Sequence, residues 1–344
     1  MSGSLRDKIA VLLGAFEDEK VSCSFEEYKE KLSFDSGLKN EERFRAVVEA
    51  VCKYSISSPD ENGEENGMFD DEGSKEMSLI ADMIISHLNH GYQSSPFLDF
   101  AEEQMIHKIL GYVGYGKGAS GVFLPGRSYC TLISMICARH HMYPDVKETG
   151  LDHPIQVVAS DNACKSTDEG ALMMGIGTNN VIKVNFDIIT PRELVDIIEK
   201  NKIFMIISTF KIANDGTVDT LDKFSKIIRK YKIWHHIDAC QGGTALFSST
   251  YRYLTDMFQD AHSITIDFHT CLNLNQQCSL LLVKDGEQLT NCSSITTPFQ
   301  SGRKTDGFKL WLCDQLDDLD VHATALFERY IESDEELSET SDQS

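Results

Sequence analysis

Apolar and polar positions follow two different patterns along the chain. In the first 110 residues, apolar side chains recur at the spacing of amphipathic helices, most clearly in segments 44–54, 77–88 and 97–110. After residue 150, short apolar runs alternate with helix-patterned segments of about ten residues. These runs predict six buried strands, at residues 154–159, 181–184, 203–208, 233–237, 263–266 and 279–283.

Helices are predicted between several of these strands, at 165–175, from 190 onward and at 221–231. Thr190 is a plausible N-cap because Pro191 follows it at the first helical position. Strands separated by such helices predict right-handed crossovers, and therefore an α/β fold with a mostly parallel sheet and helices on both faces. Because ligands of such folds bind at the carboxyl ends of the strands, we expect site residues directly after the strands.

Charge excludes some partners. The 344 residues carry a formal net charge of −22, which repels nucleic acid and anionic membrane surfaces. Segments 58–76 and 332–344 are acidic and poor in apolar residues, so they are predicted to be a solvated linker and a disordered tail. Acidic interaction segments are the alternative interpretation. No apolar run approaches the ~18 residues of a membrane span, and no signal peptide is recognised.

Several kinds of site are not supported by the sequence. The ten cysteines contain no CxxC pair, so neither a zinc ribbon nor a thioredoxin motif is predicted, and reduced thiols in a cytoplasmic protein are expected. The histidine pairs 140–141 and 235–236 are adjacent in sequence, so their side chains point apart and chelate a metal poorly. Residues 114–118 lack the spacing of a phosphate-binding P-loop. No serine nucleophile elbow is found.

Asp238 is the strongest single candidate for chemistry. It ends the fourth predicted strand and is followed by Ala239, Cys240 and a pair of glycines, so a ligand can approach it closely. An aspartate that caps the next turn would give the same local pattern.

The surrounding segments resemble the group II pyridoxal-phosphate (PLP) decarboxylases, the family of glutamate and cysteine-sulfinate decarboxylases. The resemblance covers most of the chain and is carried by 122–126 (VFLPG), 170–178 (GALMMGIGT), 231–239 (YKIWHHIDA), 277–283 (QCSLLLV) and 301–312 (SGRKTDGFKLWL). It implies the large domain of the PLP-dependent transferases of the aspartate aminotransferase type, and pyridoxal 5'-phosphate as cofactor.

The resemblance also implies roles for individual residues. Asp238 matches the aspartate that pairs with the pyridine nitrogen, and Ser128 lies in the phosphate loop 125–131. His269 matches a histidine beside the phosphate, whereas Cys164 stands where the family stacks a histidine on the ring. The Schiff-base lysine of the family's Asn-Pro-His-Lys motif falls at Thr270. A hydroxyl cannot form an imine, so no catalytic residue is assigned and covalent PLP binding is not expected.

Other departures from the family's pattern also disfavour the family's chemistry. Arg127, Phe210 and Lys211 are bulkier than the family's residues at those positions, and the C-terminal small domain of the family is expected to be absent. Lys211 and Lys165 are the lysines predicted nearest to the strand ends, and either is a candidate substitute for the missing amine. The domains predicted are a helical N-terminal segment (1–95), a decarboxylase-like large domain (96–331) and the acidic tail (332–344).

Three functions are compatible with this pattern. The first is a catalytically inactive homologue that acts through protein association, as a homodimer or a heterodimer with an active family member. The second is a sensor that binds PLP or an amino acid without reaction. The third is an active PLP-dependent carboxy-lyase acting on glutamate, aspartate or cysteine sulfinate. No metal site is predicted.

Overall fold

The computed structural model describes residues 72–89, 95–161, 163, 165–210, 222–291, 302–316 and 319–329. The chain divides into two compact units, 1–66 and 67–344, and every described residue belongs to the second. The helix predicted at 44–54, the acidic tail, Cys164 and Lys211 lie outside the described residues. The predicted domain boundaries stay predictions.

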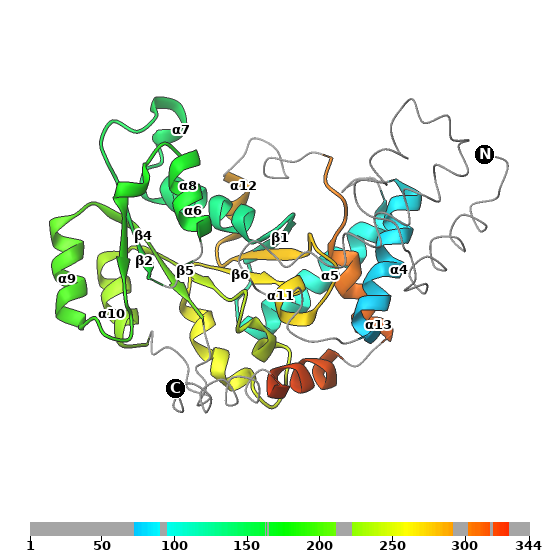
Figure 1. The fold of residues 1–344 in the computed structure, drawn as a ribbon. Helices are drawn as coiled ribbons and strands as arrows, with labels where there is room; N and C mark the ends of the chain where they lie inside the picture. The colour runs from blue at the N-terminus through cyan, green and yellow to red at the C-terminus, as the bar shows by residue number, and fades with distance from the viewer. Residues whose placement is uncertain are drawn as a thin grey trace, which may run out of the picture. The chain divides into compact units, whose positions relative to one another are not determined.

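A seven-stranded mixed sheet forms the centre of the unit, in the order β1-β7-β6-β5-β4-β2-β3 (Figure 1). Neighbouring strands from β6 to β3 are parallel, whereas β7 runs antiparallel to both β6 and β1. The strands are β1 (Ser120–Leu124), β2 (Gln156–Ser160), β3 (Val181–Val184), β4 (Ile203–Thr209), β5 (Trp234–Asp238), β6 (Ser263–Asp267) and β7 (Ser279–Val283). The α/β fold with a mostly parallel sheet is therefore confirmed.

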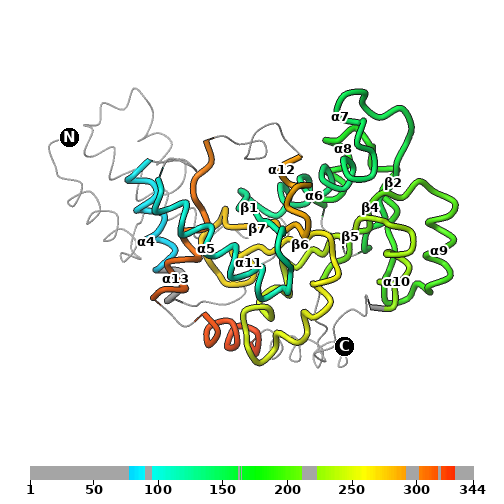
Figure 2. Tube along the Cα trace, turned by 180° about the vertical axis from the view of Figure 1, so that it is seen from behind, coloured from blue at the N-terminus to red at the C-terminus, as the bar shows by residue number. Residues whose placement is uncertain are grey.

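Helices cover both faces of this sheet. On one face, α6 and α8 pack on the strands through a core that includes Ile133, Phe204 and Leu281. Helices α9 and α10 cover the β2–β4 part of the other face, and α5 with the 3-10 helices covers its β5–β7 part (Figure 2). The helices are α4 (Glu72–Leu88), α5 (Pro96–Val113), α6 (Arg127–Met142), α7 (Val146–Thr149), α8 (Lys165–Met173), α9 (Pro191–Lys200), α10 (Asp222–Tyr231), α11 (Phe268–Leu272), α12 (Gly286–Asn291) and α13 (Gly307–Leu316). The 3-10 helices are η1 (Thr178–Asn180), η2 (Gly243–Leu246) and η3 (Arg252–Asp260).

The start of α9 follows from its capping residues, as predicted. Thr190 Oγ1 accepts a hydrogen bond from the Glu193 amide at 3.3 Å, and the Glu193 carboxylate accepts one from the Thr190 amide at 2.8 Å. This reciprocal capping box satisfies amides that would otherwise lack partners, and Pro191 occupies the first helical position.

Strand β1 was not predicted. Its five residues begin in a glycine-rich stretch, and only Val122, Phe123 and Leu124 give an apolar signal. Gly121 is required by packing, because a Cβ atom there would lie 2.8 Å from Leu282 Cδ2 on β7. The pairing of β1 with a strand late in the sequence therefore decides its conformation.

A buried polar network joins α6 to the sheet. His236 Nδ1 lies 3.1 Å from Ser134 Oγ on α6 and 2.9 Å from Ser263 Oγ on β6. Trp234 Nε1 donates to the same Ser263 hydroxyl at 2.9 Å. On the opposite side of β5, Ser208 Oγ lies 2.8 Å from His235 Nε2. Burial lowers the pKa of His235 and of His236 to about 3, so both rings are neutral around pH 7.

Candidate functional site

The predicted site residues lie at the carboxyl ends of β5 and β6 and at the start of α6. Asp238 is the last residue of β5, and Asp267 is the last residue of β6. Helix α11 follows β6 at once and carries His269 and Thr270. Because β4, β5 and β6 are parallel, their carboxyl ends meet at one edge of the sheet.

Register places a row of side chains at this edge. Thr209 on β4 pairs with Asp238 on β5, and Asp238 pairs with Thr265 on β6. Paired residues of neighbouring strands project from the same face of a sheet. His236 contacts Ser134 of α6, so Asp238, two residues further along the strand, projects toward the α6 face as well. All three side chains of the row therefore lie beneath α6.

Two buried thiols, those of Cys130 and Cys240, lie within the electrostatic influence of the carboxylates in this region. Burial raises the pKa of Cys130, on the first turns of α6, and the carboxylates of Asp267 and Asp238 raise it further. The pKa of Cys240 is also raised. Burial is the largest cause and the same two carboxylates follow, whereas Arg127 lowers this pKa. Both thiols are therefore protonated near neutral pH and are poor nucleophiles.

Asp238 is buried, with 5% of its surface exposed. Its Oδ1 atom accepts a hydrogen bond from the Cys240 amide at 3.1 Å, as in an aspartate that caps the following turn. Beside it, Thr209 is 7% exposed, and its Oγ1 has no hydrogen-bond partner among the described residues. Most buried polar atoms in proteins are paired, so an unpaired hydroxyl at a strand end marks a position for a ligand or a water molecule.

Thr270 is exposed and belongs to a short hydrogen-bonded set. Its Oγ1 donates to Asp267 Oδ2 at 2.6 Å, and Ser279 Oγ donates to Asp267 Oδ1 at 2.6 Å. Both oxygens of the Asp267 carboxylate are thus engaged by neutral hydroxyls. His269 Nδ1 lies 2.7 Å from the carbonyl oxygen of Leu274, which assigns the ring proton to Nδ1 and leaves Nε2 as an acceptor.

The predicted phosphate loop leads into α6. Gly126 precedes the helix with φ of 138°, a conformation that favours glycine, and open space surrounds the position where a Cβ atom would be. Ser128 lies exposed in the first helical turn. The sixteen-residue helix directs its first amides toward this end, which suits an anion.

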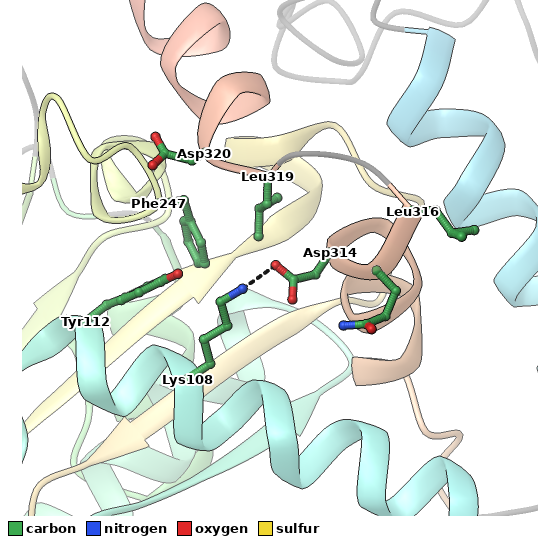
Figure 3. A pocket seen from close by; sticks show the side chains of 8 residues that line it. Lys108, Tyr112, Phe247, Asp314, Leu316, Leu319 and Asp320 are labelled. Carbon is green, nitrogen blue, oxygen red and sulfur yellow. Dashed lines mark hydrogen bonds and ion pairs between the residues drawn. The ribbon is translucent and has the colours of Figure 1, made fainter.

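Two pockets lie elsewhere in the described unit. One, of about 470 Å³, is lined by α5, α13 and residues near η2, and Lys108 Nζ in it contacts Asp314 Oδ1 at 2.5 Å (Figure 3). The guanidinium of Arg252 lies 4.0 Å from the centre of the Tyr112 ring, which also lines this pocket. The other, of about 450 Å³, lies between β3 and α9. Neither pocket is lined by a predicted site residue.

Metal-binding clusters and membrane-spanning helices are both absent from the described residues. Within those residues, no group of three or more histidine, cysteine, aspartate or glutamate side chains is arranged to hold a metal ion. No helix in the same part of the chain has the length and apolar character to cross a membrane.

Comparison with known proteins decides the family. The family model of the pyridoxal-dependent decarboxylase conserved domain matches residues 48–307. The chain belongs to this family. It is 29% identical over 340 residues to the cysteine sulfinic acid decarboxylase of Mus musculus, covering 88% of this chain and 68% of that protein. It is 30% identical over 268 residues to an acidic amino acid decarboxylase of Homo sapiens, covering 68% of this chain. The chain spans about half the length of that human relative, 51%.

Solved structures agree with this assignment. The crystal structure of mouse CSAD superposes with a TM-score of 0.75 at 26% identity, covering 94% of this chain and 75% of that one. The glutamate decarboxylase domain of a Vibrio parahaemolyticus protein superposes with a TM-score of 0.74 at 18% identity, which supports the fold alone. The family implies pyridoxal phosphate as its cofactor.

The described residues suit the pyridine nitrogen and the phosphate of that cofactor. A buried carboxylate such as Asp238 suits a protonated pyridine nitrogen, and the start of α6 suits a phosphate. An aldehyde needs an amine to form an imine, but Thr270 presents a hydroxyl bound to Asp267. Lys165, one candidate substitute, is exposed at the first position of α8. Thr270 and Asp267 therefore offer no amine for an imine.

Three residues of this edge were not assigned a role from the sequence: Thr209, Asp267 and Ser279. Asp267 directly follows a predicted strand, and ligands of such sheets bind at the carboxyl ends of the strands, so the sequence could have indicated this residue. Ser279 becomes relevant only through the antiparallel pairing of Asp267 with β7. The missing partner of Thr209 is visible only in the folded structure.

Proposed function

We propose that the chain is a catalytically inactive homologue of the acidic amino-acid decarboxylases, acting through protein association or non-covalent ligand binding. The observation that carries the proposal is Thr270, which stands at the lysine position by the resemblance. Its hydroxyl hydrogen is used in the bond to Asp267. Without an amine at this point, the cofactor cannot be held as an imine, and the step that transfers it to a substrate amine is lost.

The family chemistry that would be lost is well defined. When bound, pyridoxal phosphate supplies an electron sink for the electrons left by departing carbon dioxide. The retained groups of this chain perform only binding tasks: Asp238 would accept an N–H donor, and Ser128 with the start of α6 would hold an anion.

The proposal is tested with purified protein incubated with pyridoxal phosphate, reduced with borohydride and mapped by mass spectrometry. We expect no specific lysine adduct, no visible imine absorbance, and no carbon dioxide release from glutamate, aspartate or cysteine sulfinate. The Thr270→Lys variant is the matched positive control, because it restores an amine at the exposed position after β6. A stoichiometric adduct on one lysine of the unaltered chain would refute the proposal.

An active carboxy-lyase is the second candidate, favoured by the buried Asp238 beside a helix N-terminus. It requires a lysine from another position, with Lys165 and Lys211 as the candidates. Replacing each in turn by Arg, which retains charge but forms no stable imine, would remove an adduct only if that lysine forms it.

Association is the second part of the proposal. We infer a dimer, either of this chain with itself or with an active family member, in which this chain alters the activity of its partner. Light scattering of the purified chain, alone and mixed with a cysteine sulfinic acid decarboxylase, measures both forms. Six free and buried cysteines in the described residues support placement in a reducing compartment such as the cytoplasm, which cell fractionation would test.

A further inference from the structure

Positive charge is concentrated in one stretch of this acidic chain. Residues 200–232 contain eight lysine and arginine residues and only three aspartates, a formal net charge of +5, whereas the whole chain carries −22. Five exposed lysines of this stretch form what we call the lysine surface. They are Lys200, Lys202, Lys226, Lys230 and Lys232.

Three of these lysines meet at the amino ends of two neighbouring strands. Lys200 is the last residue of α9, and Lys202 directly precedes β4. Met205 on β4 pairs with Trp234 on β5. Lys232 lies two residues before Trp234, so the parallel register puts it beside the first residues of β4 and close to Lys202.

Helix α10 adds the other two lysines. Lys226 and Lys230 are four residues apart, so they share the exposed face of the helix while its apolar face packs in the core. The hydroxyl of Tyr231 donates to Glu199 Oε1 at 2.5 Å, which joins the end of α10 to the end of α9. The five lysines therefore lie around this contact.

Nearby acids leave the lysine surface largely uncompensated. Within the part of the chain that the structure describes, no ion pair involves any of its five lysines. Asp260 pairs instead with Arg229 at 3.3 Å, and Asp152 pairs with His153. Glu199 is the acid nearest in sequence, and it accepts the hydrogen bond from Tyr231. An exposed surface with this excess of positive charge attracts acidic groups.

The described chain ends on the same side as α10. The helix over residues 319–329 has its end beside Tyr251, whose hydroxyl donates to Glu328 Oε1 at 3.3 Å and whose ring centre lies 4.5 Å from that of Phe327. From Tyr251, η3 leads to Asp260, which pairs with Arg229 of α10. Nine residues of a 3-10 helix span only about 18 Å.

The acidic tail starts from this place. Residues 330–344 can span up to about 50 Å, more than twice the length of η3, so residues 332–344 can reach the lysine surface. Six of those thirteen residues are acidic. The other acidic segment, 58–76, leads into α4, which lies on the opposite side of the unit from α10 (Figures 1 and 2). The tail is therefore the better-placed acidic segment.

We propose that the acidic tail, residues 332–344, binds the lysine surface of the same chain through ion pairs and covers it. Single exposed ion pairs are weak, but the short tether gives the tail a high effective concentration at this surface. An acidic partner would have to displace the tail, so the tail controls access to the lysine surface. The surface lies at the amino ends of β4 and β5, away from Asp238 and Asp267, and the proposal holds with or without cofactor chemistry.

The test measures how fast each lysine of the full chain reacts with acetic anhydride, by mass spectrometry of proteolytic peptides. Exposed Lys147 on α7 and Lys165 on α8 are the internal references. The tail variant replaces all six tail acids by the matching amides. Its substitutions are Glu332→Gln, Asp334→Asn, Glu335→Gln, Glu336→Gln, Glu339→Gln and Asp342→Asn.

Relative to the reference lysines, the lysine surface should react at least about threefold faster in the tail variant than in the unaltered chain at low ionic strength. About 1 M salt should remove the difference, because it shortens the Debye length to about 3 Å. A matched control loses the same six charges from the other acidic segment and should behave as the unaltered chain. Its substitutions are Asp60→Asn, Glu61→Gln, Glu64→Gln, Glu65→Gln, Asp70→Asn and Asp71→Asn.

A carbodiimide, which couples a carboxylate to an amine in direct contact, identifies the occupant. A mixture of ¹⁵N-labelled and unlabelled chains distinguishes links within one chain from links between two. We expect links from residues 332–344 to the lysine surface within one chain, with a yield that does not depend on protein concentration.

Three results would overturn the proposal. The first is equal acetylation of the lysine surface in the unaltered chain and the tail variant. The second is the same acceleration in the matched control, because total charge rather than tail contact would then explain it. The third is a set of tail links found only between two chains, which would make a second copy the occupant of the lysine surface.

Discussion

Acidification from pH 7 to pH 5.5 should destabilise the fold strongly, because two buried histidines and the half-buried His262 are held as neutral rings. Burial lowers the pKa of His235 and His236 to about 3 and that of His262 to about 4. His262 also uses Nδ1 to accept a hydrogen bond from the His235 amide at 3.0 Å, which a protonated ring cannot do. In the unfolded chain, each ring has the ordinary pKa of about 6.5.

Proton uptake by the unfolded chain decides whether the free energy of unfolding rises or falls with acid. Below pH 6.5 the unfolded chain binds protons at these rings and the folded chain does not, so the free energy of unfolding falls as the pH falls. The loss continues down to the folded pKa values of about 3 to 4. Between pH 7 and pH 5.5 linkage gives about 4 kcal/mol for the three histidines together.

Buried carboxyl groups stabilise the folded state as the pH falls, which opposes the effect of the histidines. Burial raises the pKa of Asp306 to about 6, so the folded state gains its proton before the unfolded state does. Over the same pH range this returns about 1 kcal/mol of stability. The pKa of Glu102 is also raised by burial and adds to the compensation. The expected net loss from the three histidines and Asp306 is about 3 kcal/mol, a large part of the stability of an ordinary domain.

Urea unfolding at pH 7.0, 6.25 and 5.5 measures this loss. In the His262→Asn variant, the Oδ1 atom can still accept from the His235 amide, but the side chain does not titrate. The variant loses the stacking of His262 on Trp234, so it should be less stable at pH 7. Its loss between pH 7 and 5.5 should be smaller by about 1 kcal/mol. His107→Asn, at an exposed position of α5, is the matched control. A variant with the same pH dependence as the unaltered chain would refute the assignment of a neutral, buried His262.

Three further substitutions test the packing and capping. Glu102→Ala leaves the buried guanidinium of Arg303 without its carboxylate and should cost about 3 to 5 kcal/mol in urea unfolding. Gly307→Ala puts a Cβ atom 2.8 Å from the Phe123 ring, so about 1 to 3 kcal/mol should be lost, and an unchanged melting temperature would contradict the packing. Thr190→Ala removes the cap of α9 and should cost about 1 kcal/mol, with rescue by Ser.

Local signals predicted much of the fold. The capping residues at Thr190 and Pro191 fixed the start of α9, and apolar runs located six of the seven strands. These elements were predictable because short-range chemistry decides them: an N-cap satisfies amides within its own helix, and a buried strand is apolar on both faces.

Other features depend on residues distant in sequence. Strand β1 forms because β7 pairs with it, and Gly121 allows the two strands to approach. The network of His236, Ser134 and Ser263 joins residues from α6, β5 and β6. No periodic pattern contains such pairings, since register and partner choice arise only when the sheet assembles.

The candidate site also combined features that local sequence predicted with features that depend on distant residues. Asp238 was predictable as a strand-end acid, and the resemblance directed attention to Thr270. Neither revealed that the hydroxyl of Thr270 donates to Asp267, or that Thr209 is buried without a partner. Those observations need the relative positions of β4, β6 and α11.

Under the proposed function, the fold persists without the family's chemistry because the two depend on different residues. Thr270 is exposed, and substitutions at exposed positions usually change stability by less than about 0.5 kcal/mol. The sheet is instead stabilised by contacts remote from residue 270, such as the buried pair of Glu102 and Arg303. Under that proposal an amine at residue 270 would serve catalysis alone, whereas Asp238 is buried and accepts a hydrogen bond from the Cys240 amide. The proposed loss of the first therefore leaves the second in place.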